Sequence, residues 1–359
     1  MKDKDTISVW QFVLLLLSAR LSSDLLLPAD SLHALSLPDV ILVTAFNGFL
    51  LLILLLPTCR VLRFVPEKDL AECAKTQSRW INSGFLLLYA LVLVLDMVQF
   101  TDFAEKTVKA EFSVVGLTLL VLAASLLASF YGIQALSRTA TVVAVFSAAS
   151  LLFFAVMLLP QMDLLHFLPA TVSEPRVLLY QALRELPRTA EVAAIGVLYP
   201  RVNGKTEKGC YWFVICHIVF SVLTCVTATG VLGDFATLNA YPYYAAVSVG
   251  HLGLLPRMDL VITALWLGTF FIRFSLFFWL FIDRFRKLFD KKQKLLPALC
   301  ISAGVTLFLI GFKQGFFAQW WEEITFAYGG MLVLLCLVVP FVIKIGRTNN
   351  EKRNHTRAG

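Results

Sequence analysis

The sequence predicts an all-α integral membrane protein of ten transmembrane helices, built as two five-helix halves in which helices 1 and 6 are broken. Three observations predict this fold class: the composition, the spacing of the apolar segments and the distribution of the basic residues. Of the 359 residues, 58% are hydrophobic and only 15% are charged, and the mean hydropathy is +0.78. Because a water-soluble fold cannot cover that much apolar surface, lipid is the expected solvent.

Ten apolar segments follow one another along the chain, and a spanning helix needs roughly 20 such residues. They fall near residues 10–27, 40–56, 82–100, 113–131, 139–159, 178–200, 211–233, 259–281, 295–312 and 325–345. We therefore expect a single membrane domain over residues 1–346, with repeat one at about 8–159 and repeat two at about 176–346. The polar tail at 347–359 has no apolar face to bury and is predicted to be disordered.

The basic residues predict the orientation. With the N-terminus inside, 22 of the 31 Lys and Arg fall in cytoplasmic segments and seven in outward ones, while Arg20 and Arg273 lie within apolar segments. This bias satisfies the positive-inside rule, so both termini are expected in the cytoplasm. The net charge of +7 therefore indicates orientation in a lipid bilayer, and no nucleic acid partner is expected.

The first apolar segment carries polar residues where the bilayer centre should be: Ser18, Arg20, Ser22, Ser23 and Asp24. A break in a spanning helix is tolerated only where it is buried in protein or lines a wet cavity. These five residues are therefore candidate ligand-binding residues. Arg20 and Asp24 are four residues apart and share a helix face, which permits an ion pair that either neutralises both groups or takes part in solute or proton binding.

The sixth segment holds only eight uncharged residues in a row, Val192 to Tyr199, or about 12 Å of helix. Matching interruptions at the start of both halves are typical of an inverted-repeat transporter. The ends of half-helices hold anionic groups such as a carboxylate, which favours an amino acid or a similar small zwitterion as ligand. Thr189 and Glu191 are candidate ligand-binding residues beside this break. Glu191 is either a proton-relay or ligand-ammonium group, or a structural partner of Arg188 or of another helix.

Arg273 lies too deep in the eighth segment for easy snorkelling. We expect it to pair with an acid inside the bundle, and Asp24, Asp96 and Glu191 remain open as that acid. Trp266 precedes Arg273 by seven residues. It is either a further ligand-binding residue, as Arg273 is expected to be, or an aromatic residue of the membrane interface.

Nothing in the sequence predicts an enzyme. The five His are isolated, without HxxxH or HExxH spacing, and the seven Cys include no CxxC pair and no zinc-like spacing. A serine-based membrane hydrolase would require a Gly-x-Ser context that is not found. We therefore expect no catalytic residue, no metal site and no cofactor.

Several diffuse motifs between residues 7 and 345 point to a known family. The most specific run holds Tyr241-Pro242, Arg257-Met258-Asp259, Trp266-Leu267-Gly268 and Arg273-Phe274-Ser275-Leu276. It resembles the Tyr-Pro, Arg-Leu-Asp and Trp…Lys-x-Ser-Leu signature of the B-subunit permeases of spore germinant receptors (GerAB-type), relatives of the amino acid/polyamine/organocation transporters. The chain departs from that family with Leu21 in place of Gly, with Asp24 in place of a small apolar residue, and with Arg188-Thr189-Ala190 in place of Pro-Phe-Gly.

The resemblance implies a LeuT-like 5+5 fold and a receptor complex with an A subunit and a C lipoprotein in the spore inner membrane or cell membrane. It implies that the chain binds a small nutrient germinant, with an amino acid favoured, at the bilayer midplane and signals to its partner subunits. The alternative is a stand-alone proton- or ion-coupled amino acid transporter. Uptake of substrate by the purified protein in liposomes would distinguish the two.

Overall fold

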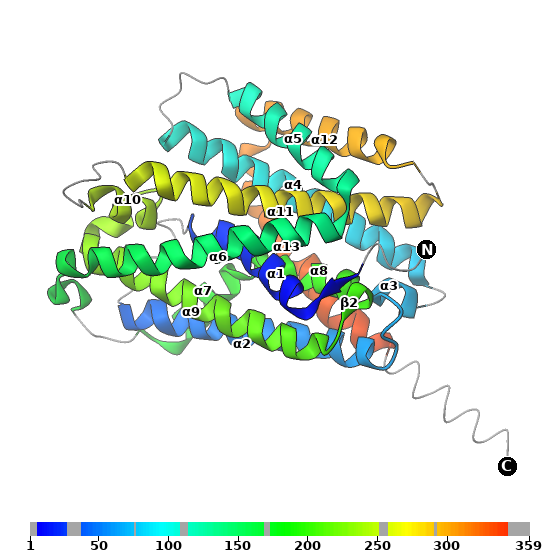
Figure 1. Cartoon of the computed structure of the whole chain (residues 1–359), viewed down its shortest axis with the longest axis horizontal. Helices are drawn as coiled ribbons and strands as arrows, with labels where there is room; N and C mark the ends of the chain where they lie inside the picture. Colours follow the sequence, from blue (N-terminus) through cyan, green and yellow to red (C-terminus); the bar gives the residue numbers. More distant parts are fainter. Residues whose placement is uncertain are drawn as a thin grey trace, which may run out of the picture.

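The computed structural model of the chain describes residues 6–26, 37–74, 77–107, 114–168, 173–250, 258–290 and 293–343. Long helices run side by side along the longest axis of the molecule (Figure 1). The tail predicted at 347–359 lies outside the described residues, and so does Arg257 of the family motif.

Helices occupy each of the ten predicted segments. They are α1 (Val9–Asp24), α2 (Leu37–Arg63), α4 (Ser78–Thr107), α5 (Val114–Tyr131), α6 (Ile133–Leu158), α7 and α8 (Pro175–Arg184 and Glu191–Leu198), α9 (Thr206–Leu232), α11 (Met258–Phe289), α12 (Leu295–Lys313) and α13 (Trp321–Val333), which continues into a π-helical turn (Leu334–Val338). Two short helices, α3 (Leu70–Cys73) and α10 (Pro242–Val249), lie between them.

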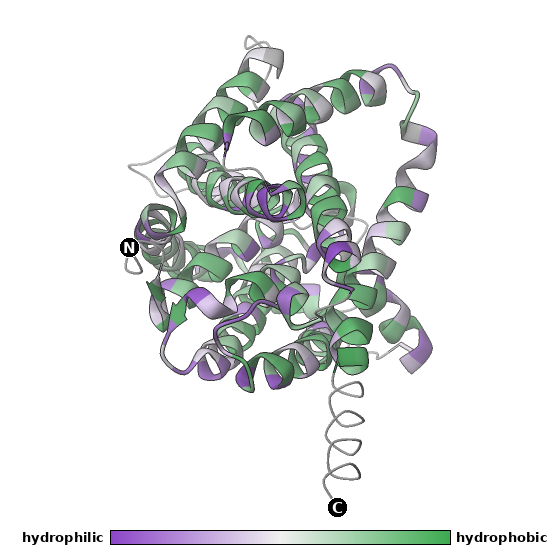
Figure 2. Ribbon diagram, turned by 90° about the vertical axis from the view of Figure 1, so that its right-hand side faces the viewer, coloured by the Kyte–Doolittle hydropathy of each residue, from purple (hydrophilic) through white to green (hydrophobic). Residues whose placement is uncertain are grey.

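Seven helices in the described part of the chain are long and apolar enough to cross a membrane by length and composition. The described residues therefore form an integral multi-pass membrane protein. The count of ten spans and the 5+5 repeat stay predictions. Large apolar side chains such as Leu120, Phe146 and Phe326 are exposed, as expected for helices that face lipid. Figure 2, turned to look along the bundle, shows largely hydrophobic ribbons throughout the helices.

Helix α1 lies in the centre of the bundle, where it contacts α6, α9 and α11 (Figure 1). Its residues are buried on all sides from Leu15 to Asp24, so it has no lipid-facing stripe. Ser8 begins the helix: its hydroxyl accepts a hydrogen bond from the Gln11 N–H at 3.2 Å, and the Gln11 side chain accepts one from the Ser8 N–H at 3.0 Å. This reciprocal capping box satisfies two N–H groups that the helix itself leaves unpaired.

A two-residue parallel pairing joins the chain before α1 to the chain after α8 at one end of the bundle. Strand β1 (Ile7–Ser8) precedes α1, and β2 (Val202–Asn203) follows α8, with Ile7 opposite Val202. The chain entry to α1 and the chain exit from α8 are therefore held together by main-chain hydrogen bonds.

The break predicted in the sixth segment is present, whereas the break predicted inside the first is not. α7 is followed by a 3₁₀ turn (Leu186–Arg188) and two non-helical residues before α8 begins at Glu191. In contrast, α1 is continuous across Ser18–Asp24 and ends at Asp24, and residues 27–36 lie outside the described part. Small polar residues do not unwind a helix whose hydroxyls bond to its own carbonyls, as Ser22 does to Ala19 O at 2.8 Å.

Candidate functional site

Arg273 of α11 binds two carboxylates from two other helices. Its Nε lies 2.9 and 2.8 Å from the two Asp96 oxygens on α4, and its Nη1 contacts Glu191 Oε1 at the start of α8. The three side chains are nearly inaccessible, with exposures of 4%, 7% and 1%. We call Asp96, Glu191 and Arg273 the Arg273 triad. Two carboxylates face one guanidinium, so the fully ionised triad carries one uncompensated negative charge.

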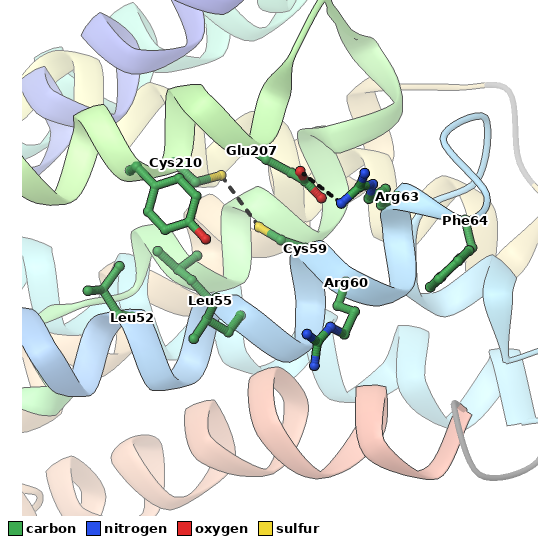
Figure 3. A pocket seen from close by; sticks show the side chains of 10 residues that line it. Leu52, Leu55, Cys59, Arg60, Arg63, Phe64, Glu207 and Cys210 are labelled. Atoms are coloured by element: carbon green, nitrogen blue, oxygen red, sulfur yellow. Dashed lines mark hydrogen bonds and ion pairs between the residues drawn. The ribbon is translucent and has the colours of Figure 1, made fainter.

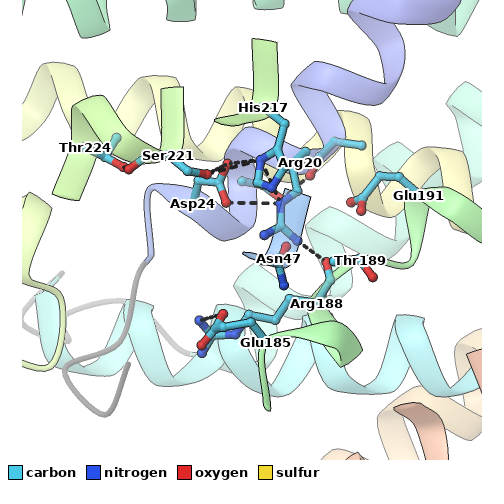
Figure 4. A network of polar contacts seen from close by, with 12 residues as sticks. Arg20, Asp24, Asn47, Glu185, Arg188, Thr189, Glu191, His217, Ser221 and Thr224 are labelled. Atoms are coloured by element: carbon cyan, nitrogen blue, oxygen red, sulfur yellow. Dashed lines mark hydrogen bonds and ion pairs between the residues drawn. The ribbon is translucent and has the colours of Figure 1, made fainter. Parts of the chain in front are cut away.

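A second buried cluster forms around Arg20 and Asp24, near the last turn of α1 (Figure 4). Arg20 Nε lies 3.1 Å from Asp24 Oδ1, which is the ion pair that the four-residue spacing permits. On α9, His217 Nδ1 lies 3.1 Å from Asp24 Oδ2, and the Ser221 hydroxyl donates to the same oxygen at 2.9 Å. We call these four residues the Arg20 cluster.

Arg20 also binds the backbone at the break between α7 and α8. Its Nη1 donates to the Arg188 carbonyl oxygen at 2.6 Å (Figure 4), and the Thr189 hydroxyl donates to Leu186 O at 2.6 Å. Backbone groups freed by a break inside a membrane must find a partner in the protein. The sequence therefore places an arginine on α1 where the interrupted segment exposes a carbonyl.

A cavity of about 890 Å³ opens above the Arg273 triad. Asp96, Arg273 and Tyr328 line its inner part, and Lys106 and Lys313 line its outer part. Asp96 and Lys106 are ten residues apart on α4, so the part of the cavity between them covers about 15 Å of that helix. This is about half of the roughly 30 Å hydrocarbon thickness of a bilayer. We call it the central cavity.

The Arg20 cluster lies next to the central cavity, because a second cavity that borders the cluster shares two lining residues with the central cavity. A smaller cavity of about 40 Å³ borders Arg20, Asp24, His217 and Ser221. Ser23 and Arg188 line both cavities. A solute in the central cavity would therefore contact residues next to the Arg20 cluster and the broken segment at once.

The nine residues expected to bind ligand come together around α1, but they differ in access. Four line a cavity: Arg20, Ser23, Asp24 and Arg273. The other five support them. Ser18 donates to Ala140 O at 3.0 Å and Trp266 Nε1 donates to Ser22 O at 3.1 Å, while Ser22, Thr189 and Glu191 bond within the packed interior. Trp266 is buried against Phe100, Phe103 and Phe270, so its ring packs inside the protein.

Sequence reasoning did not single out His217, Ser221 or Tyr328 as site residues. His217 lacked metal-site spacing, yet an ionisable residue inside an apolar segment is itself a signal of function. The Tyr328 hydroxyl and Glu191 Oε2 are buried and find no hydrogen-bond partner among the described residues. Tyr328 lines the central cavity, where a polar solute would give its hydroxyl a hydrogen-bond partner.

An ion-pair network lies near the other end of α11. Arg284 is fully buried and donates to Asp69 Oδ2 at 2.7 Å and to Asn82 Oδ1 at 3.1 Å. Burial alone would raise the pKa of the Asp69 carboxyl, but the charges of Arg284 and Lys287 lower this pKa below its usual value of 3.8. The network ties the segment between α2 and α4, which holds Asp69, to α11. None of its residues lines the central cavity.

Comparisons with known proteins agree with the fold. The family model described as "Spore germination protein" matches residues 6–317. A solved structure of a Na⁺-coupled sialic acid symporter, in a substrate-bound outward-open state, superposes with a TM-score of 0.61 at 13% identity. The match covers 92% of this chain and 78% of that one. Identity this low shows only that this chain and the symporter share a fold. No curated protein matches the sequence.

Proposed function

The chain belongs to the spore germination protein family, and from this premise we propose that it is the nutrient-binding membrane subunit of a germinant receptor. In this proposal a small nutrient, with an amino acid favoured, enters the central cavity and binds at the bilayer midplane. Binding changes the equilibrium between two conformations, and partner subunits, an A subunit and a C lipoprotein, receive the change.

One observation carries the proposal: a cavity about half a membrane deep ends on Asp96 and Arg273, and Arg273 also binds a second buried carboxylate, that of Glu191. Charges inside a membrane are expensive and mark ligand or ion pathways. The ammonium group of an amino acid would offset the excess charge of Asp96 and Glu191. Arg273 and the Tyr328 hydroxyl, which line the same cavity, supply donors for a carboxylate.

The Arg20 cluster supplies the link from binding to conformation. Arg20 joins Asp24 on α1 to the Arg188 carbonyl in the broken segment, and Arg188 lines the central cavity. A nutrient that binds more tightly to one arrangement of this break shifts the population of that arrangement. Without such a difference in affinity, binding would transmit nothing.

The test compares Tyr328→Phe with Tyr131→Phe, because each variant removes a single hydroxyl. Tyr328 is buried at the cavity, whereas Tyr131 is exposed at the end of α5. We expect spores that carry Tyr328→Phe at the normal protein level to need about tenfold more nutrient for half-maximal germination, as for a lost hydrogen bond to a charged group. Spores with Tyr131→Phe should respond as the wild type does. Unchanged nutrient sensitivity in Tyr328→Phe, and also in Glu191→Ala and Arg20→Ala, would remove the proposed binding site.

A second function, a stand-alone proton- or ion-coupled amino acid transporter, is favoured by the shared fold of the symporter and by the charge excess of the triad, which a proton or a cation would also offset. Substrate uptake by the purified protein in liposomes, abolished by Asp96→Asn, would support this second function. Nutrient binding without uptake would support the receptor.

A further inference from the structure

A groove of about 370 Å³ lies between α2 and α9 (Figure 3), and it shares no lining residue with the central cavity. Its walls are apolar at one end, where Leu52, Leu55 and Leu56 line it, and basic at the other, where Arg60 and Arg63 line it. Cys59 and Cys210 form its floor, with their sulfur atoms 3.6 Å apart. We call it the α2–α9 groove.

The change from apolar to basic follows the helix axis. Figure 3 shows Leu52, Leu55, Arg60 and Phe64 in order along α2. Leu52 and Arg63 are eleven residues apart, or about 16 Å of helix. This length matches a polar headgroup followed by part of an acyl chain. A small soluble anion would use only the basic end.

The basic end carries a net positive charge. Arg63 is 71% exposed and lies 3.7 Å from Glu207 of α9, a long and solvated ion pair. Arg60 is exposed and has no ion-pair partner among the described residues. Two guanidinium groups against one carboxylate leave one positive charge, and guanidinium groups bind phosphate oxygens with good geometry.

The position of the groove matches a membrane interface. Leu56 and Tyr211 in its walls are 49% and 48% exposed, and Phe64 at its basic end is 73% exposed. Arg60 and Arg63 lie at the end of α2 that the basic residues predict to be cytoplasmic, where anionic headgroups attract basic side chains. Apolar residues exposed along a span face acyl chains.

We propose that the α2–α9 groove binds one anionic phospholipid, with its phosphate on Arg60 and Arg63 and an acyl chain along Leu52, Leu55 and Leu56. This lipid is distinct from the nutrient, and the proposal holds whether or not the central cavity binds an amino acid.

The test measures lipid retention by the purified full-length protein in detergent, using native mass spectrometry. Added phosphatidylglycerol is compared with phosphatidylcholine and with glycerol 3-phosphate. We expect phosphatidylglycerol to bind about tenfold more tightly than phosphatidylcholine, because each basic residue near the headgroup attracts an anionic lipid electrostatically. Glycerol 3-phosphate, which lacks the acyl chains, should bind too weakly to be retained.

In the variant Arg60→Gln/Arg63→Gln, the ratio of the affinity for phosphatidylglycerol to that for phosphatidylcholine should fall about tenfold. Its matched control is Arg79→Gln/Arg138→Gln, which removes two exposed arginines at the same predicted side but outside the groove, and which should retain the preference. Equal retention of the two lipids by the wild type would overturn the proposal, and this measurement needs no variant. So would an unchanged preference in Arg60→Gln/Arg63→Gln, or tight binding of glycerol 3-phosphate, which would indicate a soluble-anion site.

Discussion

Replacement of Arg273 by glutamine tests the charge arrangement at the base of the central cavity. The guanidinium of Arg273 is the only basic group that contacts Asp96 and Glu191 among the described residues, through two contacts of 2.9 and 2.8 Å to Asp96 and one to Glu191. Arg273→Gln leaves two carboxylates buried side by side. Removing one partner of a buried ion pair costs about 3–5 kcal/mol, so we expect a loss of that size in the free energy of unfolding.

The assay is denaturant unfolding of the purified protein in detergent, with Lys313→Gln as the control. Lys313 also pairs with a glutamate, Glu105, but the two side chains are 44% and 46% exposed. Exposed pairs contribute only about 0–1 kcal/mol, so this variant should unfold close to the wild type. The comparison separates the effect of burial from the effect of losing a charge.

Asp96→Asn in the Arg273→Gln background provides the decisive result. If an uncompensated charge causes the loss, this second substitution should restore part of the stability, because it removes one of the two buried charges. A double variant less stable than Arg273→Gln would refute the reasoning. An Arg273→Gln protein within about 1 kcal/mol of the wild type would refute it as well, since exposed pairs already reach that value.

Two further predictions concern the other buried charges. The folded Asp69 carboxyl has a pKa below its unfolded value of 3.8. Its ionised form therefore stabilises the fold above pH 3.8, and this contribution disappears as the pH falls through the folded pKa. When unfolding is measured against pH, the free energy of unfolding should fall more steeply below about pH 4 in the wild type than in Asp69→Asn. Asp24→Asn leaves the buried guanidinium of Arg20 without its carboxylate. Thermal unfolding should show a free energy of unfolding lower by about 3–5 kcal/mol. A melting curve equal to that of the wild type would show that other groups stabilise Arg20.

Local sequence signals predicted much of this architecture. Apolar runs placed helices in all ten segments, and the density of charges in the sixth segment predicted the break before Glu191. The i, i+4 spacing of Arg20 and Asp24 predicted their ion pair. The same reasoning was wrong for the first segment, where α1 stays helical across Ser18–Asp24. A helix buried on all sides keeps its internal hydrogen bonds even where its side chains are polar.

The sequence by itself determined that the chain is a membrane protein, that the sixth segment is interrupted, and that a deep Arg273 requires an acid. Only the tertiary structure decided which acids: Asp96 lies 177 positions and Glu191 lies 82 positions away along the chain. It also placed His217 beside Asp24, 193 positions apart. Helix periodicity sets which residues share a face within a few turns, whereas contacts between helices depend on how the helices pack. For charges buried between membrane helices, that packing selects the partner, because a charge left unpaired inside a membrane is costly.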